Sequence, residues 1–145
     1  MSLSTEIDAD LKSAMLAHRQ ELVDLLRLLK SALKNEMISL IKSDLTDEEA
    51  LKVIRREAKK REDSIAIFTT GNRADLAAKE QAELNLIKKY LPAEMSENEV
   101  RSLVEAVLAE SADRQFGVIM KSVMAKAGGR ADGTLVSKIV KELLA

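Results

Sequence analysis

The segment AGGRADG, residues 127–133, combines an arginine and an aspartate with three of the five glycines in the chain. Glycines let backbone N–H groups approach a phosphate, over which Arg130 would close. The same letters also suit a boundary between two helices, in which Gly128 or Gly129 ends one helix and Asp132 caps the next. The carboxylate of Asp132 would occupy the place of an anion, so the helix boundary is the simpler interpretation. It leaves Arg130 without a role.

Known phosphate and catalytic motifs are missing from the sequence. No lysine followed by serine or threonine comes after Gly133, so the loop does not have the Walker pattern. The chain also has no G-x-S-x-G, no HExxH and no Rossmann glycine fingerprint. These absences point away from an autonomous enzyme, and we expect no catalytic residue, no cofactor and no metal site.

Basic residues gather in the C-terminal part of the chain. They outnumber Asp132 and Glu142 there, and we name them the C-terminal basic cluster: Lys121, Lys126, Arg130, Lys138 and Lys141. Such a cluster is a candidate for contact with nucleic-acid phosphates. Ordinary solvated surface charge also explains the cluster, and the residues alone favour this second explanation.

A second basic stripe lies in the segment VIRREAKKRE, residues 53–62. At 3.6 residues per turn its cations share one face, which comprises Lys52, Arg55, Arg56, Lys59 and Lys60. The stripe could follow a phosphate backbone. Glu48, Glu57 and Glu62 lie close enough to pair with these cations, so a solvated helix face is the commoner explanation.

Other reactive side chains are scarce. The chain has no cysteine and one histidine, His18, which we expect at the end of a surface helix. One imidazole cannot build a multi-histidine metal site. Phe68, Tyr90 and Phe116 are too scattered to form a base-stacking platform, which argues against recognition of single strands.

Composition indicates an all-α protein. Among the 145 residues 46% are hydrophobic but only 2% are aromatic, proline occurs once, and the net charge is −1. Alanine, leucine, glutamate and lysine are strong helix formers. The acidic N-terminus does not resemble a transit peptide, and no apolar stretch approaches the roughly 20 residues that span a bilayer. We expect a cytoplasmic protein.

Apolar periodicity and capping signals predict seven helices. Their approximate bounds are 5–17, 20–42, 46–70, 72–90, 96–111, 116–127 and a last helix after residue 133. Capping boxes at Thr46 and Ser96 mark two starts. Gly71 is expected to end the third helix in the left-handed conformation and Asn72 to cap the fourth.

The only proline marks the expected domain boundary. Pro92 follows the fourth predicted helix within the segment LPAEMSENEV. We therefore predict an N-terminal helical domain of about four helices, residues 1–92, and a small three-helix domain, residues 93–145. Both are expected to be packed helical subdomains, because short helices need partners.

Four segments carry a resemblance to a known family: LLRLLKSALKNEMI (25–38), DEEALKVIRREAKKREDSIAIF (47–68), LIKKYLPAEMSENEV (86–100) and KAGGRADGTLVSKIVKELL (126–144). In order and spacing they resemble the YqeY-like family, bacterial proteins related to the C-terminal tail domain of the aspartyl/glutamyl-tRNA amidotransferase B subunit. The last segment is most similar to that tail.

The resemblance implies an all-α protein whose C-terminal domain helps to hold tRNA. It would place Lys126, Arg130 and Lys138 toward the tRNA, with Lys121 and Lys141 beside them. Glutamine-dependent carbon–nitrogen ligase activity would belong to the relative, because no counterpart of its catalytic domains is present. A non-catalytic tRNA-binding or amidotransferase-related accessory protein is thus the leading hypothesis. The alternative is a helical adaptor that docks on a translation enzyme without touching nucleic acid.

Overall fold

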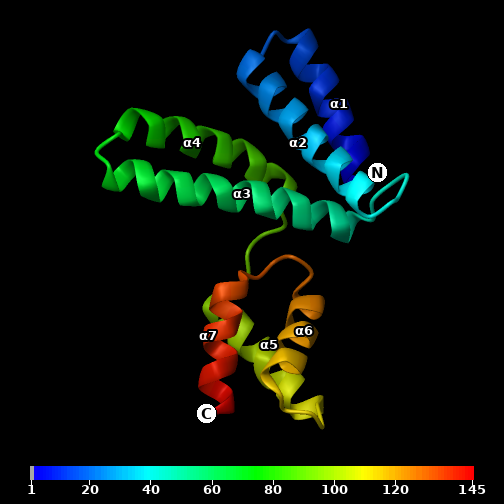
Figure 1. The fold of residues 1–145 in the computed structure, drawn as a ribbon, viewed down its shortest axis with the longest axis vertical. Coiled ribbons are helices and arrows are strands. Elements are labelled where there is room, and N and C mark those ends of the chain that lie inside the picture. Colours follow the sequence, from blue (N-terminus) through cyan, green and yellow to red (C-terminus); the bar gives the residue numbers. More distant parts are fainter. Residues whose placement is uncertain (1) are drawn as a thin grey trace. The chain divides into compact units, whose positions relative to one another are not determined.

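The computed structural model describes residues 2–145, in which helices are the only regular secondary structure. Their order is α1 (Leu3–Leu16), α2 (Gln20–Ser39), α3 (Asp47–Thr70), α4 (Ala74–Ile87), the 3-10 turn η1 (Lys88–Tyr90), α5 (Glu97–Glu110), α6 (Phe116–Ala127) and α7 (Gly133–Leu144). Figure 1 shows them as two antiparallel hairpins, α1–α2 and α3–α4, followed by a three-helix group. The prediction of an all-α fold is confirmed.

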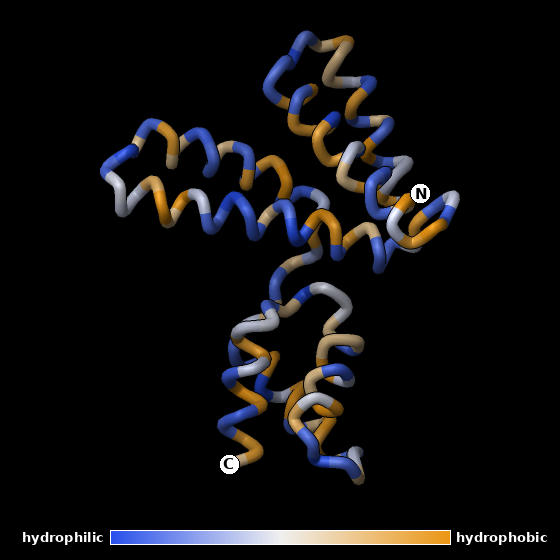
Figure 2. Tube along the Cα trace, viewed as in Figure 1, coloured by the Kyte–Doolittle hydropathy of each residue, from blue (hydrophilic) through white to orange (hydrophobic). Residues whose placement is uncertain are grey.

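The chain divides into two compact units, residues 1–91 and residues 92–145. Each has its own apolar core, and hydrophobic and hydrophilic residues alternate along the helices of both (Figure 2). The first core centres on fully buried Ile7, Leu26, Leu29, Ile54 and Ile87. The second centres on Val104, Ile119, Val123, Val136 and Ile139.

The two hairpins of the first unit are joined by polar contacts near their packed faces. Tyr90 Oη donates a hydrogen bond to Asp10 Oδ2 over 2.5 Å, and Lys89 Nζ donates to the same oxygen over 2.8 Å. These bonds, that of Lys89 first, lower the pKa of Asp10. Burial and the hydrogen bond to Asp10 raise the pKa of Tyr90. The 3-10 turn η1, which follows α4, is thereby fixed to α1.

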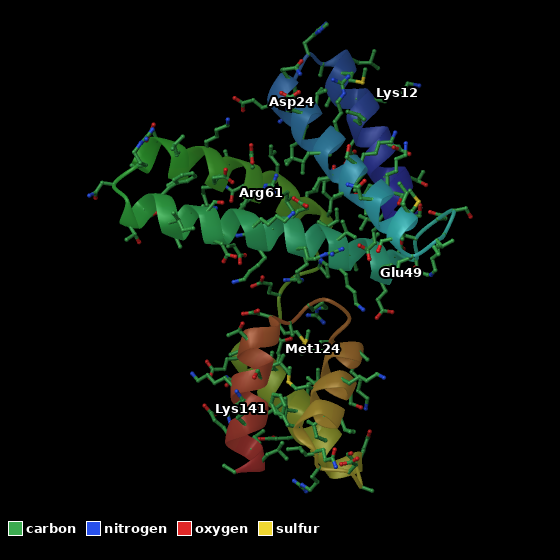
Figure 3. All side chains as sticks on the ribbon, viewed as in Figure 1. Lys12, Asp24, Glu49, Arg61, Met124 and Lys141 are labelled. Carbon is green, nitrogen blue, oxygen red and sulfur yellow. The ribbon has the colours of Figure 1, made fainter. Side chains whose placement is uncertain are left out.

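A buried ion pair joins Glu57 and Arg61 on α3, and Figure 3 labels Arg61. Arg61 Nη1 donates to Glu57 Oε2 over 2.8 Å and to the main-chain oxygen of Glu57 over 3.0 Å. Arg61 Nε lies 3.4 Å from Glu83 Oε2 on α4. A buried arginine needs such partners, because an unpaired charge in an apolar environment is costly.

The predicted helix starts are confirmed where a side chain makes the capping hydrogen bond. Both capping boxes are present, Thr46 with Glu49 and Ser96 with Glu99. The prediction that α3 ends at Thr70 with Gly71 after it is confirmed, but the predicted conformation of Gly71 and the predicted capping role of Asn72 are wrong. Gly71 has a φ of −81°, and Asn72 takes the left-handed conformation with a φ of 58°. Asparagine tolerates that region, so it ends the turn and is not the cap of α4.

The second helix is shorter than predicted. The apolar pattern extends to about residue 42, but α2 ends at Ser39. Ile41 has a φ of 54° and is 93% exposed, so the chain reverses there and the last apolar side chains point into solvent. Periodicity alone does not reveal this change of backbone conformation.

Candidate nucleic-acid interface

The loop between α6 and α7 is a helix boundary in the structure. Gly128 and Gly129 have φ values of 58° and 80°, which are left-handed conformations that suit glycine, and they end α6. Asp132 is the N-cap of α7 and accepts a hydrogen bond from the Thr134 N–H over 3.3 Å. Gly133 is the first residue of α7. The geometry of this segment matches the helix-boundary interpretation.

Arg130, which that interpretation left without a role, makes contacts within its own unit. Its Nε donates a hydrogen bond to the carbonyl oxygen of Ala93 over 3.0 Å, and its Nη2 lies 3.7 Å from Glu99 Oε2. Its own carbonyl oxygen accepts from the Met95 N–H over 2.8 Å. The arginine thus holds the segment that leads into α5 against the α6–α7 loop.

Helices α6 and α7 form an antiparallel hairpin whose register two contacts define. A Cβ on Gly133 would lie 3.9 Å from Met124 Cε, and Lys141 Nζ lies 5.6 Å from the centroid of the Phe116 ring. Gly133 therefore lies opposite Met124 across the hairpin, and Lys141 lies opposite Phe116. By the same register, Lys121 lies level with Val136. Lys138 lies one turn before Lys141 on α7. Figure 3 labels Met124 and Lys141 on the two helices.

The five cations of the C-terminal basic cluster divide into two groups. Lys126 pairs with Glu110 over 3.0 Å, and Arg130 makes the contacts described above. Lys121, Lys138 and Lys141 are exposed and have no ion-pair partner within residues 2–145. We call these three the open lysines.

Charge is unevenly distributed over the second unit. Residues 92–115 carry two basic and six acidic side chains, a net charge of −4, whereas residues 116–145 carry five basic and two acidic side chains, a net charge of +3. Both acidic groups of the later segment have partners. Asp132 caps α7, and Glu142 accepts from Arg101 Nη2 on α5 over 2.9 Å. The α6–α7 hairpin is therefore a locally basic surface in a chain of nearly balanced charge.

The basic stripe on α3 is largely paired. Arg56 contacts Glu36 on α2 over 2.5 Å, Lys59 contacts Asp63 over 3.2 Å, and Lys60 contacts Glu57 over 3.1 Å. These contacts satisfy the charges within the first unit. They favour the solvated-face interpretation of the stripe over contact with phosphates.

Side chains suited to metal binding are not brought together within residues 2–145. No group of three or more histidine, cysteine, aspartate or glutamate residues in the described part of the chain could hold a metal ion. His18 follows α1, where it is exposed and has a φ of 54°. Across residues 2–145 no helix combines the length and the apolar character required to cross a bilayer.

Sequence reasoning missed the pairing of Phe116 with Lys141. The two residues are 25 positions apart, and neither belongs to a local motif. Only the hairpin register brings them together. The amphipathic pattern of both helices predicts that they pack, but it does not fix their relative level.

The helices and the basic hairpin define a small all-α protein with a two-hairpin unit and a three-helix unit. The chain belongs to the Yqey-like protein family, whose sequence model matches residues 4–144. It is also similar to proteins named "Altered inheritance of mitochondria protein 41, mitochondrial" from yeasts. Identity to the Saccharomyces cerevisiae protein is 34% over 116 residues, which is 75% of this chain and 62% of that protein.

Two further yeast relatives carry the same name. The Lachancea thermotolerans protein is 35% identical over 104 residues, 70% of this chain and 55% of the relative. The Vanderwaltozyma polyspora protein is 33% identical over 108 residues, 73% of this chain and 58% of the relative. The chain thus spans between half and two thirds of the length of these relatives. Neither their name nor the family description is that of an enzyme.

Proposed function

We propose that this protein is a non-catalytic accessory protein that binds tRNA through the α6–α7 hairpin. The observation that carries the proposal is the set of open lysines, Lys121, Lys138 and Lys141, on a hairpin whose only two acidic side chains already have partners. Cations that are not neutralised by neighbouring carboxylates are available to phosphates. The similarity of residues 126–144 to the tail of a tRNA amidotransferase subunit supports tRNA as the nucleic acid.

The structure changes which residues the proposal depends on. The family resemblance implies that Arg130 faces the tRNA, but its guanidinium is engaged by Ala93 and Glu99. Lys126 is engaged by Glu110. Both keep exposed surface and remain secondary candidates, and the open lysines become the principal ones.

Salt dependence tests the proposal directly. If three lysines neutralise three phosphates of duplex RNA or DNA, the logarithm of the association constant should fall with a slope of about −2.7 against the logarithm of salt concentration. Between 50 and 200 mM salt this corresponds to a loss of about 40-fold in affinity. Fluorescence anisotropy of labelled tRNA measures it. Absence of binding at low salt would overturn the proposal for the isolated protein.

A second candidate function rests on exposed apolar side chains of the first unit. Leu16, Ile38, Ile41 and Ile67 are each at least 67% exposed. A helical adaptor that docks on another protein, for example an amidotransferase or another translation enzyme, would use such residues as contacts. Substituting them would then abolish association with that enzyme, and added tRNA would have no effect on it.

The cellular location belongs to the proposal as well. Accessory binding of tRNA fits the cytoplasmic location expected from the sequence, although the yeast relatives are named as mitochondrial proteins. Both compartments contain tRNA, so the binding function does not depend on which is correct.

A further inference from the structure

Phe116 is an exposed aromatic residue on the same hairpin as the open lysines. It is the first residue of α6 and is 40% exposed, whereas Tyr90 is 7% exposed. A single exposed hydrophobic residue is common on protein surfaces and needs no explanation by itself. The Phe116 ring differs from such isolated residues because a cation lies over it.

A cation lies over the ring. Lys141 Nζ is 5.6 Å from the ring centroid, within the range at which an ammonium group interacts with an aromatic face. The ring comes from the first turn of α6 and the ammonium group from the last turn of α7. The contact therefore restrains the ring and places a positive charge over one of its two faces.

Apart from Lys141, the charged residues beside the ring in sequence or one turn away are two cations and two carboxylates. Lys138 lies one turn from Lys141, and exposed Arg114 precedes Phe116 by two residues. The nearby carboxylates have partners: Asp113 Oδ1 accepts from the Gln115 N–H over 2.9 Å, and Glu142 accepts from Arg101. Glu142 is paired with a cation whereas Asp113 keeps its charge, and Arg114 and Lys138 have no ion-pair partner within residues 2–145.

The exposed ring and the nearby lysines together restrict the chemical class of the ligand that could bind here. A purely apolar ligand would use the ring but not the lysines, and a simple anion would use the lysines but not the ring. An unpaired nucleotide uses both, because its base stacks on an aromatic face while its phosphate contacts cations. A base in the interior of a duplex has both faces covered by neighbouring bases and cannot stack in this way, so only the terminal pairs of a duplex offer a face.

We propose that Phe116 and Lys141 form a stacking site for one unpaired nucleotide, with the base against the Phe116 ring and the phosphate on Lys141 and Lys138. The inference rests on the proposed function and adds a substrate class to it: RNA that presents an unpaired base. The three scattered aromatic residues of the chain cannot form an extended platform for a single strand. One nucleotide needs only one ring.

Conservative variants of Phe116 test the site. Phe116→Leu keeps an apolar side chain but removes the aromatic face, and Phe116→Tyr keeps the face. Val118→Ala serves as the matched control, since Val118 is 41% exposed on the same helix. The probes are a fluorescently labelled 12-nucleotide single-stranded RNA and a blunt 12-base-pair RNA duplex, measured by anisotropy at low salt.

The expected result is specific to the single strand. Phe116→Leu should weaken binding of the single strand about tenfold and binding of the duplex less than twofold, because base–aromatic stacking is lost. Phe116→Tyr and Val118→Ala should bind both probes like the wild type. Equal losses for both probes, or no loss for the single strand, would overturn the stacking site but leave the proposed function standing. Failure of the wild type to bind either probe would overturn both.

Discussion

Arg130 Nε donates a hydrogen bond to the carbonyl oxygen of Ala93, 37 residues earlier in the chain, over 3.0 Å. The bond joins the α6–α7 loop to the segment that leads into α5, and the hydrogen bond from the Met95 N–H to the Arg130 carbonyl oxygen reinforces it. Glycines and an aspartate cap explain the ends of the two helices. The arginine explains how their loop is held in place.

Replacing Arg130 should therefore destabilise the protein. Arg130→Ala removes the bond to Ala93 and should lower the free energy of unfolding by about 1 kcal/mol, the usual net value of one hydrogen bond. Thermal or urea unfolding measures the change, with Arg114→Ala as a control at an exposed arginine that has no ion pair within the described residues. Equal stability of the two variants, together with a large loss of tRNA binding in Arg130→Ala, would show that Arg130 is a ligand contact and not a structural one.

The buried pair of Glu57 and Arg61 predicts strongly non-additive mutations. Arg61→Met leaves the carboxylate of Glu57 buried with only Lys60 beside it and should cost about 3 kcal/mol of stability. The double variant Glu57→Met/Arg61→Met should recover most of that loss, because apolar side chains replace both charges. Urea unfolding of the four proteins in a double-mutant cycle measures the coupling. Additive effects would mean that the pair does not act as a unit.

Ile41 predicts a stabilising substitution. A β-branched residue in the left-handed region costs about 1–2 kcal/mol relative to a right-handed conformation, and a side chain that is 93% exposed gains little packing in return. Ile41→Asn should raise the free energy of unfolding by about 0.5–1 kcal/mol, because asparagine tolerates this conformation. Ile38→Asn, at an exposed position inside α2, should not stabilise. A fall in the melting temperature of Ile41→Asn would contradict the strain argument.

The capping box of α3 predicts an acid-dependent contribution to stability. Hydrogen bonds from Lys42 and from the Thr46 backbone lower the pKa of Glu49 from its ordinary value of 4.5 to about 2. A lowered pKa means that the folded protein binds the proton less tightly than the unfolded chain. The stabilisation is therefore complete above pH 4.5 and is lost as the pH falls toward 2.

Glu49→Gln isolates this effect, since glutamine preserves the geometry of the capping box but not the charge. We expect the wild type to be more stable than the variant at pH 7 and the two to converge as the pH approaches 2. Melting temperatures at successive pH values measure the difference. A difference that stays constant between pH 7 and pH 2 would contradict the assignment.

The helix caps could be predicted from the sequence, whereas the conformation of the α3–α4 turn could not. Thr46, Ser96 and Asp132 bond to backbone groups within three residues, so their roles as caps can be predicted from spacing alone. Gly71 and Asn72 are both suited to a left-handed turn, and local chemistry did not decide between them. In the structure Asn72 adopts the left-handed conformation.

Contacts between distant residues account for what was missed at the candidate site. The sequence alone identifies the C-terminal basic cluster. Which of its side chains are engaged and which are open depends on contacts with Glu110, Ala93 and Glu99, which lie 16 to 37 positions away from their partners. The burial of Arg61 likewise depends on Glu83 of the neighbouring helix. Periodicity predicts that helices pack, yet only their packed positions show which charges are neutralised.

The most direct test of the account compares the removal of charge from two surfaces. In one variant the open lysines Lys121, Lys138 and Lys141 are replaced by glutamine. In the other, glutamine replaces Lys12, Lys34 and Lys79, three exposed lysines of the first unit that have no ion-pair partner in the described part of the chain. The two variants carry the same net charge, so any difference between them reports position.

Anisotropy of labelled tRNA at 50 mM salt is the measurement. The account predicts at least a tenfold loss of affinity for the variant of the α6–α7 hairpin, with a shallower salt dependence, and less than a twofold loss for the variant of the first unit. Equal losses in the two variants would contradict the account, because they would show that the hairpin has no special part in binding.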